Sequence, residues 1–144
     1  MPLSPQSSSK GLETYQGPWT KQTSTHLLNR VLFGAKQAEI QEFLAKGLNA
    51  SVTALLNPTD PIPSPPLNEY NTATVIDPAV APGTTWVNQP TNDGTINGYR
   101  RNSFKKWLTG VLIHQDISIR EKLTLFWANH FGTEADTISN ANYV

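Results

Sequence analysis

Apolar residues recur at helical spacing between Ser118 and Gly132, and this pattern predicts a helix with one apolar side. Ser118 and Glu121 have the spacing of a capping box, and Gly132 supplies a left-handed stop. The apolar stripe carries Ile119, Leu123, Phe126, Trp127 and His130. We therefore expect a core helix whose His130 imidazole points inward.

Weaker repeats of the same period predict three further helices in the first third of the chain. The first begins at Thr20 or Ser24 and ends at Gly34, where capping residues and a glycine stop mark the ends. The second runs from Lys36 to Lys46, and the third covers roughly Ala50 to Leu56. Because the connections are tight, we expect these helices to form a compact cluster.

The composition changes between residues 57 and 98, which hold eight of the eleven prolines and no Lys or Arg. This stretch predicts a long loop, in which Thr84 to Val87 and the turn signal at Asn92-Asp93-Gly94 favour one short hairpin. A loop of this length fits either a solvated insertion over the helices or a contact surface that a partner orders.

Helical spacing returns near Tyr99 and predicts a fourth helix with Trp107 on its apolar side. It leads directly into the helix that begins at Ser118. We expect these two helices to pack antiparallel around Trp107 and Trp127.

Together these patterns predict an all-α fold, a small irregular bundle of about five helices with a long Pro-rich loop between the third and fourth. Residues 1–19 are rich in Ser, Pro and Gly and predict a flexible N-terminal arm. Residues 20–144 form a single helical domain in this interpretation, with 57–98 as its loop insertion.

The charge balance and the cysteine content exclude several classes of protein. Eleven basic and eleven acidic residues cancel, which argues against nucleic acid or an anionic membrane as the partner. The absence of Cys removes disulfides, thiolate metal sites and a thiol nucleophile. The chain has neither a signal-peptide pattern nor an apolar run long enough to span a membrane. A cytoplasmic protein and a processed exported protein both remain open.

Side chains able to do chemistry are few, and the catalytic candidates are His130, Asn129, His26 and Arg30. His130 could act as a general acid or base, or it could be a buried imidazole that is merely hydrogen-bonded. Arg30 could likewise contact a substrate or have a structural role only, because an inward guanidinium often binds a carboxylate or helix carbonyls. No pair of His has the spacing of a metal site, and no phosphate loop or nucleophile elbow is present. We therefore predict no metal and no cofactor, and leave open whether the protein is an enzyme.

Several segments in this order resemble a known family. They are His26 to Gly34 (HLLNRVLFG), Gly47-Leu48 with Val52 to Leu56, Trp107-Leu108, and Arg120 to Phe131 (REKLTLFWANHF). Their order and spacing, over about residues 20 to 138, resemble the opening of the bacterial family called domain of unknown function 1800. The family pattern often has a His or another polar residue where this chain carries Ala128.

The resemblance implies that members are longer, with a further Asn-Glu-Asn motif that this chain lacks. Val144 is then expected to be a truncation, and Thr137 to Val144 the start of another helix whose partner is the rest of its own chain. One hypothesis is a helical structural or interaction segment, which could form a homodimer through exposed apolar surface. The other is half of an enzyme, metal or ligand site that residues after Val144 complete, which requires His26 and His130 to converge.

Overall fold

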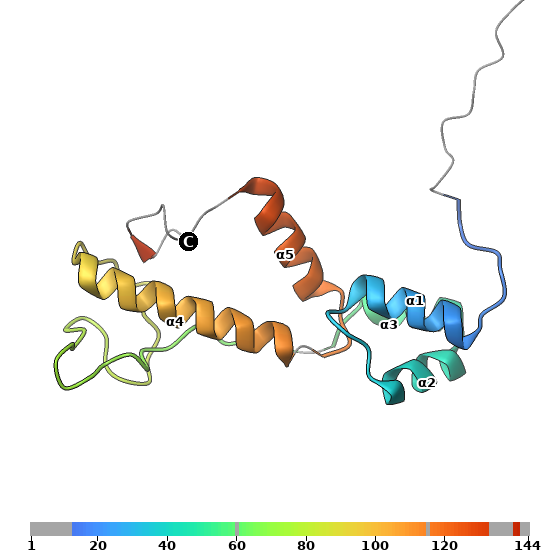
Figure 1. Cartoon of the computed structure of the whole chain (residues 1–144), viewed down its shortest axis with the longest axis horizontal. Helices are drawn as coiled ribbons and strands as arrows, with labels where there is room; N and C mark the ends of the chain where they lie inside the picture. The colour runs from blue at the N-terminus through green and yellow to red at the C-terminus, as the bar shows by residue number, and fades with distance from the viewer. Residues whose placement is uncertain (1–12, 60, 115, 133–139, 142–144) are drawn as a thin grey trace, which may run out of the picture.

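The chain folds into five α-helices in the computed structural model, which describes residues 13–59, 61–114, 116–132 and 140–141. The helices are α1 Lys21–Val31, α2 Gln37–Lys46, α3 Leu48–Leu56, α4 Gly94–Ile113 and α5 Arg120–Phe131 (Figure 1). Within these residues no strand forms, and the one β contact that the structure records is an isolated bridge between Leu67 and Thr85. The predicted all-α fold is confirmed, whereas the predicted hairpin is wrong.

Helices α1, α2 and α3 pack in sequence at one end of the molecule, as their short connections predict (Figure 1). Thr20 caps α1 by accepting a hydrogen bond from the backbone of Thr23. Gly47 lies at φ 80°, a conformation that glycine adopts without strain, and allows α3 to follow α2 at once. The buried core of this cluster consists of Leu28, Leu32, Ile40, Phe43 and Leu55.

Polar side chains inside this cluster are satisfied by helix carbonyls. The Phe43 carbonyl accepts from Ser51 Oγ at 3.0 Å and from Trp19 Nε1 at 3.2 Å. Ser24 Oγ is 3.4 Å from the carbonyl of Ile40. Because buried donors are costly to leave unpaired, these bonds allow the small polar residues to lie between closely packed helices.

Helix α4 begins earlier than its apolar spacing predicts. The Asp93 carboxylate accepts from the backbone of Thr95 at 2.8 Å and of Ile96 at 3.0 Å, so Asp93 is a helix cap. The sequence signal at Asp93-Gly94 is shared by hairpin turns and helix starts, and the structure adopts the second. The loop insertion therefore spans residues 57–93 instead of 57–98.

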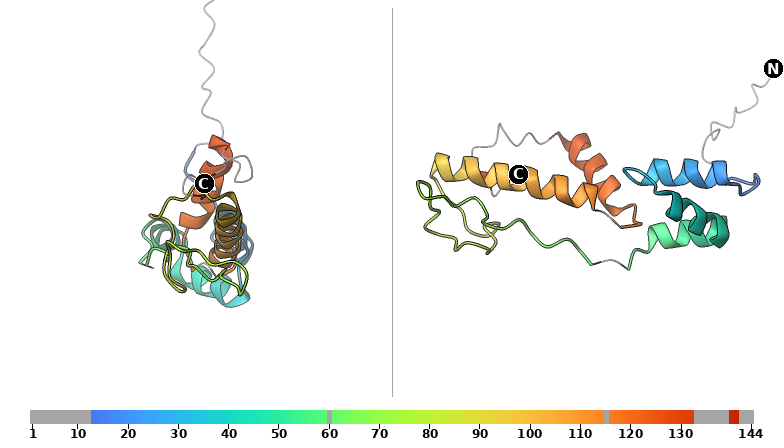
Figure 2. Two further views of the ribbon diagram at one scale, coloured as in Figure 1. Left: turned by 90° about the vertical axis from the view of Figure 1, so that its left-hand side faces the viewer. Right: turned by 60° about the horizontal axis from the view of Figure 1, so that its bottom comes forward.

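The loop between α3 and α4 is ordered against α4 and forms a second core. Val80 and Trp86 are buried there with Ala141, and Tyr70 and Phe104 pack against them. Asn68 organises the turn, because its Nδ2 donates to the Val80 carbonyl at 2.7 Å while its backbone pairs with Thr84 and Gly83. Figure 2 shows the loop lying along α4, away from the α1–α3 cluster.

Helix α5 departs from its prediction at its first turn and on its apolar side. Ser118 Oγ accepts from the backbone of Arg120 at 3.0 Å, whereas Glu121 binds the Arg120 guanidinium at 2.8 Å instead of closing a capping box. Gly132 ends the helix in the left-handed region at φ 63°, as predicted. Helices α4 and α5 diverge (Figure 1), so the predicted antiparallel packing around Trp107 and Trp127 is wrong.

The reason is that the loop takes the place expected of α5. Trp107 lies against Phe104, with ring centroids 5.8 Å apart, and its Nε1 donates to the carbonyl of Ser64 in the loop. Most of the predicted arm and of the predicted helix at 137–144 lies outside the described residues. None of the described helices has the length and apolar character needed to cross a membrane.

Candidate interaction surface

The four candidate residues lie on two helices, and all are exposed. His26 and Arg30 are on α1, and Asn129 and His130 are on α5. The prediction that His130 points into the core is wrong, because neither α4 nor any other described element covers the apolar side of α5. The helical period defined the stripe correctly, but not what lies against it.

Two of these residues line the same hollow, which has a volume of about 490 Å³ and lies between α1 and α5. Arg30 and Asn129 line it, whereas His26 and His130 do not. The remaining lining residues are Asn29, Phe33, Ile119, Lys122, Leu123, Leu125 and Phe126. The hypothesis of a half-site required the two histidines to converge, and the hollow does not bring them together.

The hollow has the polar groups of a binding surface and few groups suited to bond-making chemistry. Among the described residues, no three His, Asp or Glu side chains cluster as a metal site requires. Arg30 and Asn129 supply donors and an amide oxygen, which can orient a ligand. Their catalytic role stays a prediction from sequence.

One side of α5 is a continuous aromatic surface, which we call the aromatic face. Phe126 and Trp127 meet edge to face, with ring centroids 5.1 Å apart, and Trp127 stacks on Phe131 at 5.7 Å. His130 lies 5.6 Å from Trp127 and 6.1 Å from Phe126, so it belongs to the same ring cluster. Four large apolar side chains of this face are between 42% and 74% exposed: Leu123, Phe126, Trp127 and Phe131.

The charges of α5 are confined to its first turn and are already bound. Arg120 pairs with Glu121 at 2.8 Å. Lys122 donates to the carbonyl of Leu32 at 3.1 Å and lies 4.6 Å from the centre of the Phe33 ring. From Leu123 to Phe131 the helix has no Asp, Glu, Lys or Arg. The aromatic face is therefore free of fixed charge.

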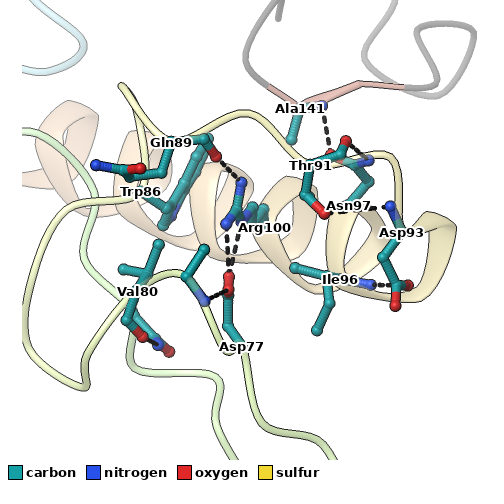
Figure 3. Close-up of polar contacts among 12 residues, drawn as sticks. Asp77, Val80, Trp86, Gln89, Thr91, Asp93, Ile96, Asn97, Arg100 and Ala141 are labelled. Carbon is teal, nitrogen blue, oxygen red and sulfur yellow. Dashed lines mark hydrogen bonds and ion pairs between the residues drawn. The ribbon is translucent and has the colours of Figure 1, made fainter.

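A second polar centre, buried between the loop and α4, escaped the sequence analysis. Arg100 is fully buried, and its Nε donates to Asp77 Oδ2 at 2.9 Å (Figure 3). Arg100 Nη2 is 2.7 Å from the same oxygen, an ion pair outside hydrogen-bond geometry, and Nη1 donates to the carbonyl of Gln89. Tyr70 Oη donates to Asp77 Oδ2 at 2.6 Å. We call these three side chains the Arg100 clamp.

The clamp fixes the ionisation of its members. Burial raises the pKa of Asp77, but hydrogen bonds from Tyr70, Arg100 and the Ala79 amide, together with the guanidinium charge, outweigh it and hold the pKa below its usual value. Burial is also the main cause that raises the pKa of Tyr70 to about 12, with the Asp77 carboxylate adding to it. At neutral pH the clamp therefore holds Asp77 as a carboxylate and Tyr70 as a neutral phenol.

Tyr70→Phe is expected to change how stability depends on alkaline pH. Because the pKa of Tyr70 rises from 10.0 to about 12 on folding, the wild type holds a stability contribution below pH 10.0 that is lost as the pH rises through about 12. The variant lacks this loss, so the difference in unfolding free energy between the two proteins shrinks across that range.

Urea unfolding of both proteins at a series of alkaline pH values measures the difference. Tyr99→Phe is the matched control, because the Tyr99 ring stacks on Tyr70 at 6.4 Å. A difference between wild type and Tyr70→Phe that stays constant with pH would contradict the assignment.

A groove of about 940 Å³ runs beside the clamp, between the loop and α4. Tyr70, Tyr99 and Trp107 are its aromatic walls, and Lys106 and Glu69 lie on it with opposite charge. Arg100, the first of the four basic residues between 100 and 106, is buried in the clamp and does not line this groove. No local signal in the sequence pairs Arg100 with Asp77, which is 23 residues away.

Comparison with known proteins gives the affiliation of the chain. Neither the curated proteins nor the solved structures contain a match. The family model described as Protein of unknown function (DUF1800) matches residues 26–144, and the chain therefore belongs to that family.

Proposed function

We propose that this chain is an interaction module, and that the aromatic face of α5 binds the same face of a second copy. The observation that carries the proposal is the exposure of Leu123, Phe126, Trp127 and Phe131 on one side of one helix. Monomeric proteins rarely expose a contiguous apolar patch of this kind without using it. Aromatic residues are also enriched at the centres of protein interfaces.

The spacing of the face supports a symmetric contact. Residues 123, 126, 127 and 130 repeat at intervals of three and four, which is the spacing of a helix-helix seam. When two copies of α5 lie antiparallel about a two-fold axis, Phe126 of one copy meets Trp127 of the other. Leu123 then meets His130. A two-fold contact repeats each pairing, so a self-complementary face is sufficient.

The absence of charge on the aromatic face and the polar residues beside it also favour a second copy as the partner. Because residues 123–131 carry no Asp, Glu, Lys or Arg, two copies of the face meet without repulsion between fixed like charges. Arg30 and Asn129 stand beside the face on the hollow that Phe126 also lines. They supply the polar rim that commonly surrounds an apolar contact.

The size of the face sets the strength of the contact. An aromatic side chain buries about 150–250 Å² when fully covered, so four partly exposed side chains offer on the order of 400 Å² per copy. The pair then buries on the order of 800 Å², below the roughly 1,200–2,000 Å² of a stable complex. We therefore expect a weak, concentration-dependent dimer with a dissociation constant of about 10 µM to 1 mM.

Sedimentation over a wide range of concentration tests the proposal. The average mass of the wild type is expected to rise with concentration, and Trp127→Glu is expected to remain monomeric because it places a charge against Phe126 of the other copy, at the centre of the apolar contact. Ile113→Glu is the matched control, since Ile113 is 71% exposed on α4 and lies outside the face.

Two results would count against a homotypic contact. One is a wild type that stays monomeric at the highest concentration while its helices remain folded. The other is association that Trp127→Glu and Ile113→Glu leave equally strong.

A further inference from the structure

The segment Pro61 to Leu67 is held in an extended conformation by its own sequence. Each residue from 61 to 66 is either a proline or the residue before one, as the run Pro-Ile-Pro-Ser-Pro-Pro shows. Proline fixes its own φ near −65° and disfavours the helical region for the residue before it. The sequence therefore restricts the segment to polyproline II and related extended backbone, which has three residues per turn and no internal hydrogen bonds.

Three side chains from α4 and α5 bind the carbonyls of this segment at intervals of three residues. Arg120 Nη2 donates to the Pro61 carbonyl at 3.1 Å. Trp107 Nε1 donates to the Ser64 carbonyl at 2.6 Å. Ser103 Oγ donates to the Leu67 carbonyl at 2.9 Å. We call Ser103, Trp107 and Arg120 the donor rail.

The interval of three matches the period of the ligand. In polyproline II, residues 61, 64 and 67 lie on one side of the backbone, about 9 Å apart. A rail of three donors therefore contacts one side only. This arrangement follows the backbone period, and needs no particular side chain at the contacted positions.

A second side of the segment packs on aromatic rings. Pro66 is buried and Pro63, three residues before it, is half-buried. Pro63 and Pro66 share a hollow of about 310 Å³ with Trp86, Phe104 and Trp107. An aromatic surface that packs prolines while an indole N–H donates to the backbone is how dedicated modules bind proline-rich ligands.

We propose that the donor rail with its aromatic rings is a receptor for polyproline II segments, that it carries its own ligand in cis, and that it accepts a proline-rich segment of another polypeptide in trans. The seated segment Pro61 to Leu67 defines the chemistry of the occupant, which is an extended backbone with prolines two to three residues apart. The inference uses residues of α4, the loop and Arg120 in the first turn of α5, and it does not depend on dimerisation through the aromatic face.

The cis segment competes with any ligand in trans because it is tethered, and a short tether gives an effective concentration of the order of millimolar. Pro63→Gly with Pro65→Gly weakens this competitor without changing the rail, since glycine removes the restriction on the backbone. A labelled peptide with the sequence Pro-Ile-Pro-Ser-Pro-Pro-Leu is expected to bind this opened variant at least tenfold more tightly than it binds the wild type.

The contribution of the rail is tested by Trp107→Phe in the opened variant. This change keeps an aromatic ring and removes the indole N–H, so peptide affinity is expected to fall about fivefold to tenfold, the worth of one hydrogen bond. The control peptide Ala-Ile-Ala-Ser-Ala-Ala-Leu lacks the polyproline bias and is expected to bind at least tenfold more weakly than the proline peptide.

A second measurement covers the case in which the opened variant does not fold, which circular dichroism detects. In the wild-type chain, the indole N–H resonance of Trp107, assigned with Trp107→Phe, is expected to shift as excess proline peptide replaces the cis segment. Absence of that shift overturns the proposal. So does equal binding of the proline and alanine peptides by a folded opened variant.

Discussion

Asp77→Ala is expected to lower the free energy of unfolding by about 3–5 kcal/mol, as breaking a buried ion pair on one side generally does. The change leaves the Arg100 guanidinium buried without its carboxylate, and it removes the acceptor of Tyr70 Oη. Arg100 is fully buried in the native state, so no water molecule replaces the lost carboxylate. Urea unfolding at neutral pH measures the loss.

Two companion variants separate the ion pair from the loss of a loop side chain. Glu69→Ala removes an exposed acid from the same loop and is expected to change stability by less than about 0.5 kcal/mol. Asp77→Ala combined with Arg100→Met is expected to cost less than Asp77→Ala alone, because the double change leaves no buried charge. If Asp77→Ala resembled Glu69→Ala, the clamp would not contribute to stability.

The ion pair between Asp77 and Arg100 also determines how stability changes at acid pH. Because folding lowers the pKa of Asp77 below 3.8, its contribution is present above that value and is lost as the pH falls through the folded-state pKa. The difference between wild type and Asp77→Ala should therefore shrink in strong acid.

Phe43→Ala is expected to lower the free energy of unfolding by about 3–5 kcal/mol, the usual cost of removing a fully buried Phe side chain. Phe43 has no exposed surface and lies in the core that α1, α2 and α3 share. The cavity has little chance to collapse, since the Phe43 carbonyl holds Ser51 and Trp19 in place.

Thermal and urea unfolding, followed by far-ultraviolet circular dichroism, measure this loss. Phe131→Ala is the control, because Phe131 is 74% exposed at the end of α5, and at low protein concentration it is expected to cost less than about 0.5 kcal/mol. Similar losses for the two variants would contradict the assignment of Phe43 to the core.

The α1–α3 cluster could be predicted from sequence because its signals are local. Thr20 and Gly47 mark helix ends, and the apolar period places Leu28 and Phe43 inward. The start of α4 could not be predicted in the same way, because Asp93-Gly94 is compatible with a turn and with a cap. The tertiary structure decides between the two, and Asp93 caps α4.

The site was harder to predict than the helices, for a reason that α5 makes clear. Periodicity shows which residues share a side of a helix, but it contains no information about what covers that side. The loop packs on α4 at Trp107, so the stripe on α5 that carries Trp127 stays exposed. The Arg100 clamp could not be predicted from the sequence, because an ion pair between a loop and a helix leaves no periodic pattern.

The proline segment also affects the tendency of the protein to aggregate at high concentration. An extended, exposed backbone normally offers amide groups on which a neighbouring chain can add a β-strand. Four of the six residues from Pro61 to Pro66 have no amide hydrogen, and Ile62 and Ser64 are the two that do. This segment can therefore stay extended at the surface without acting as a template for β-aggregation.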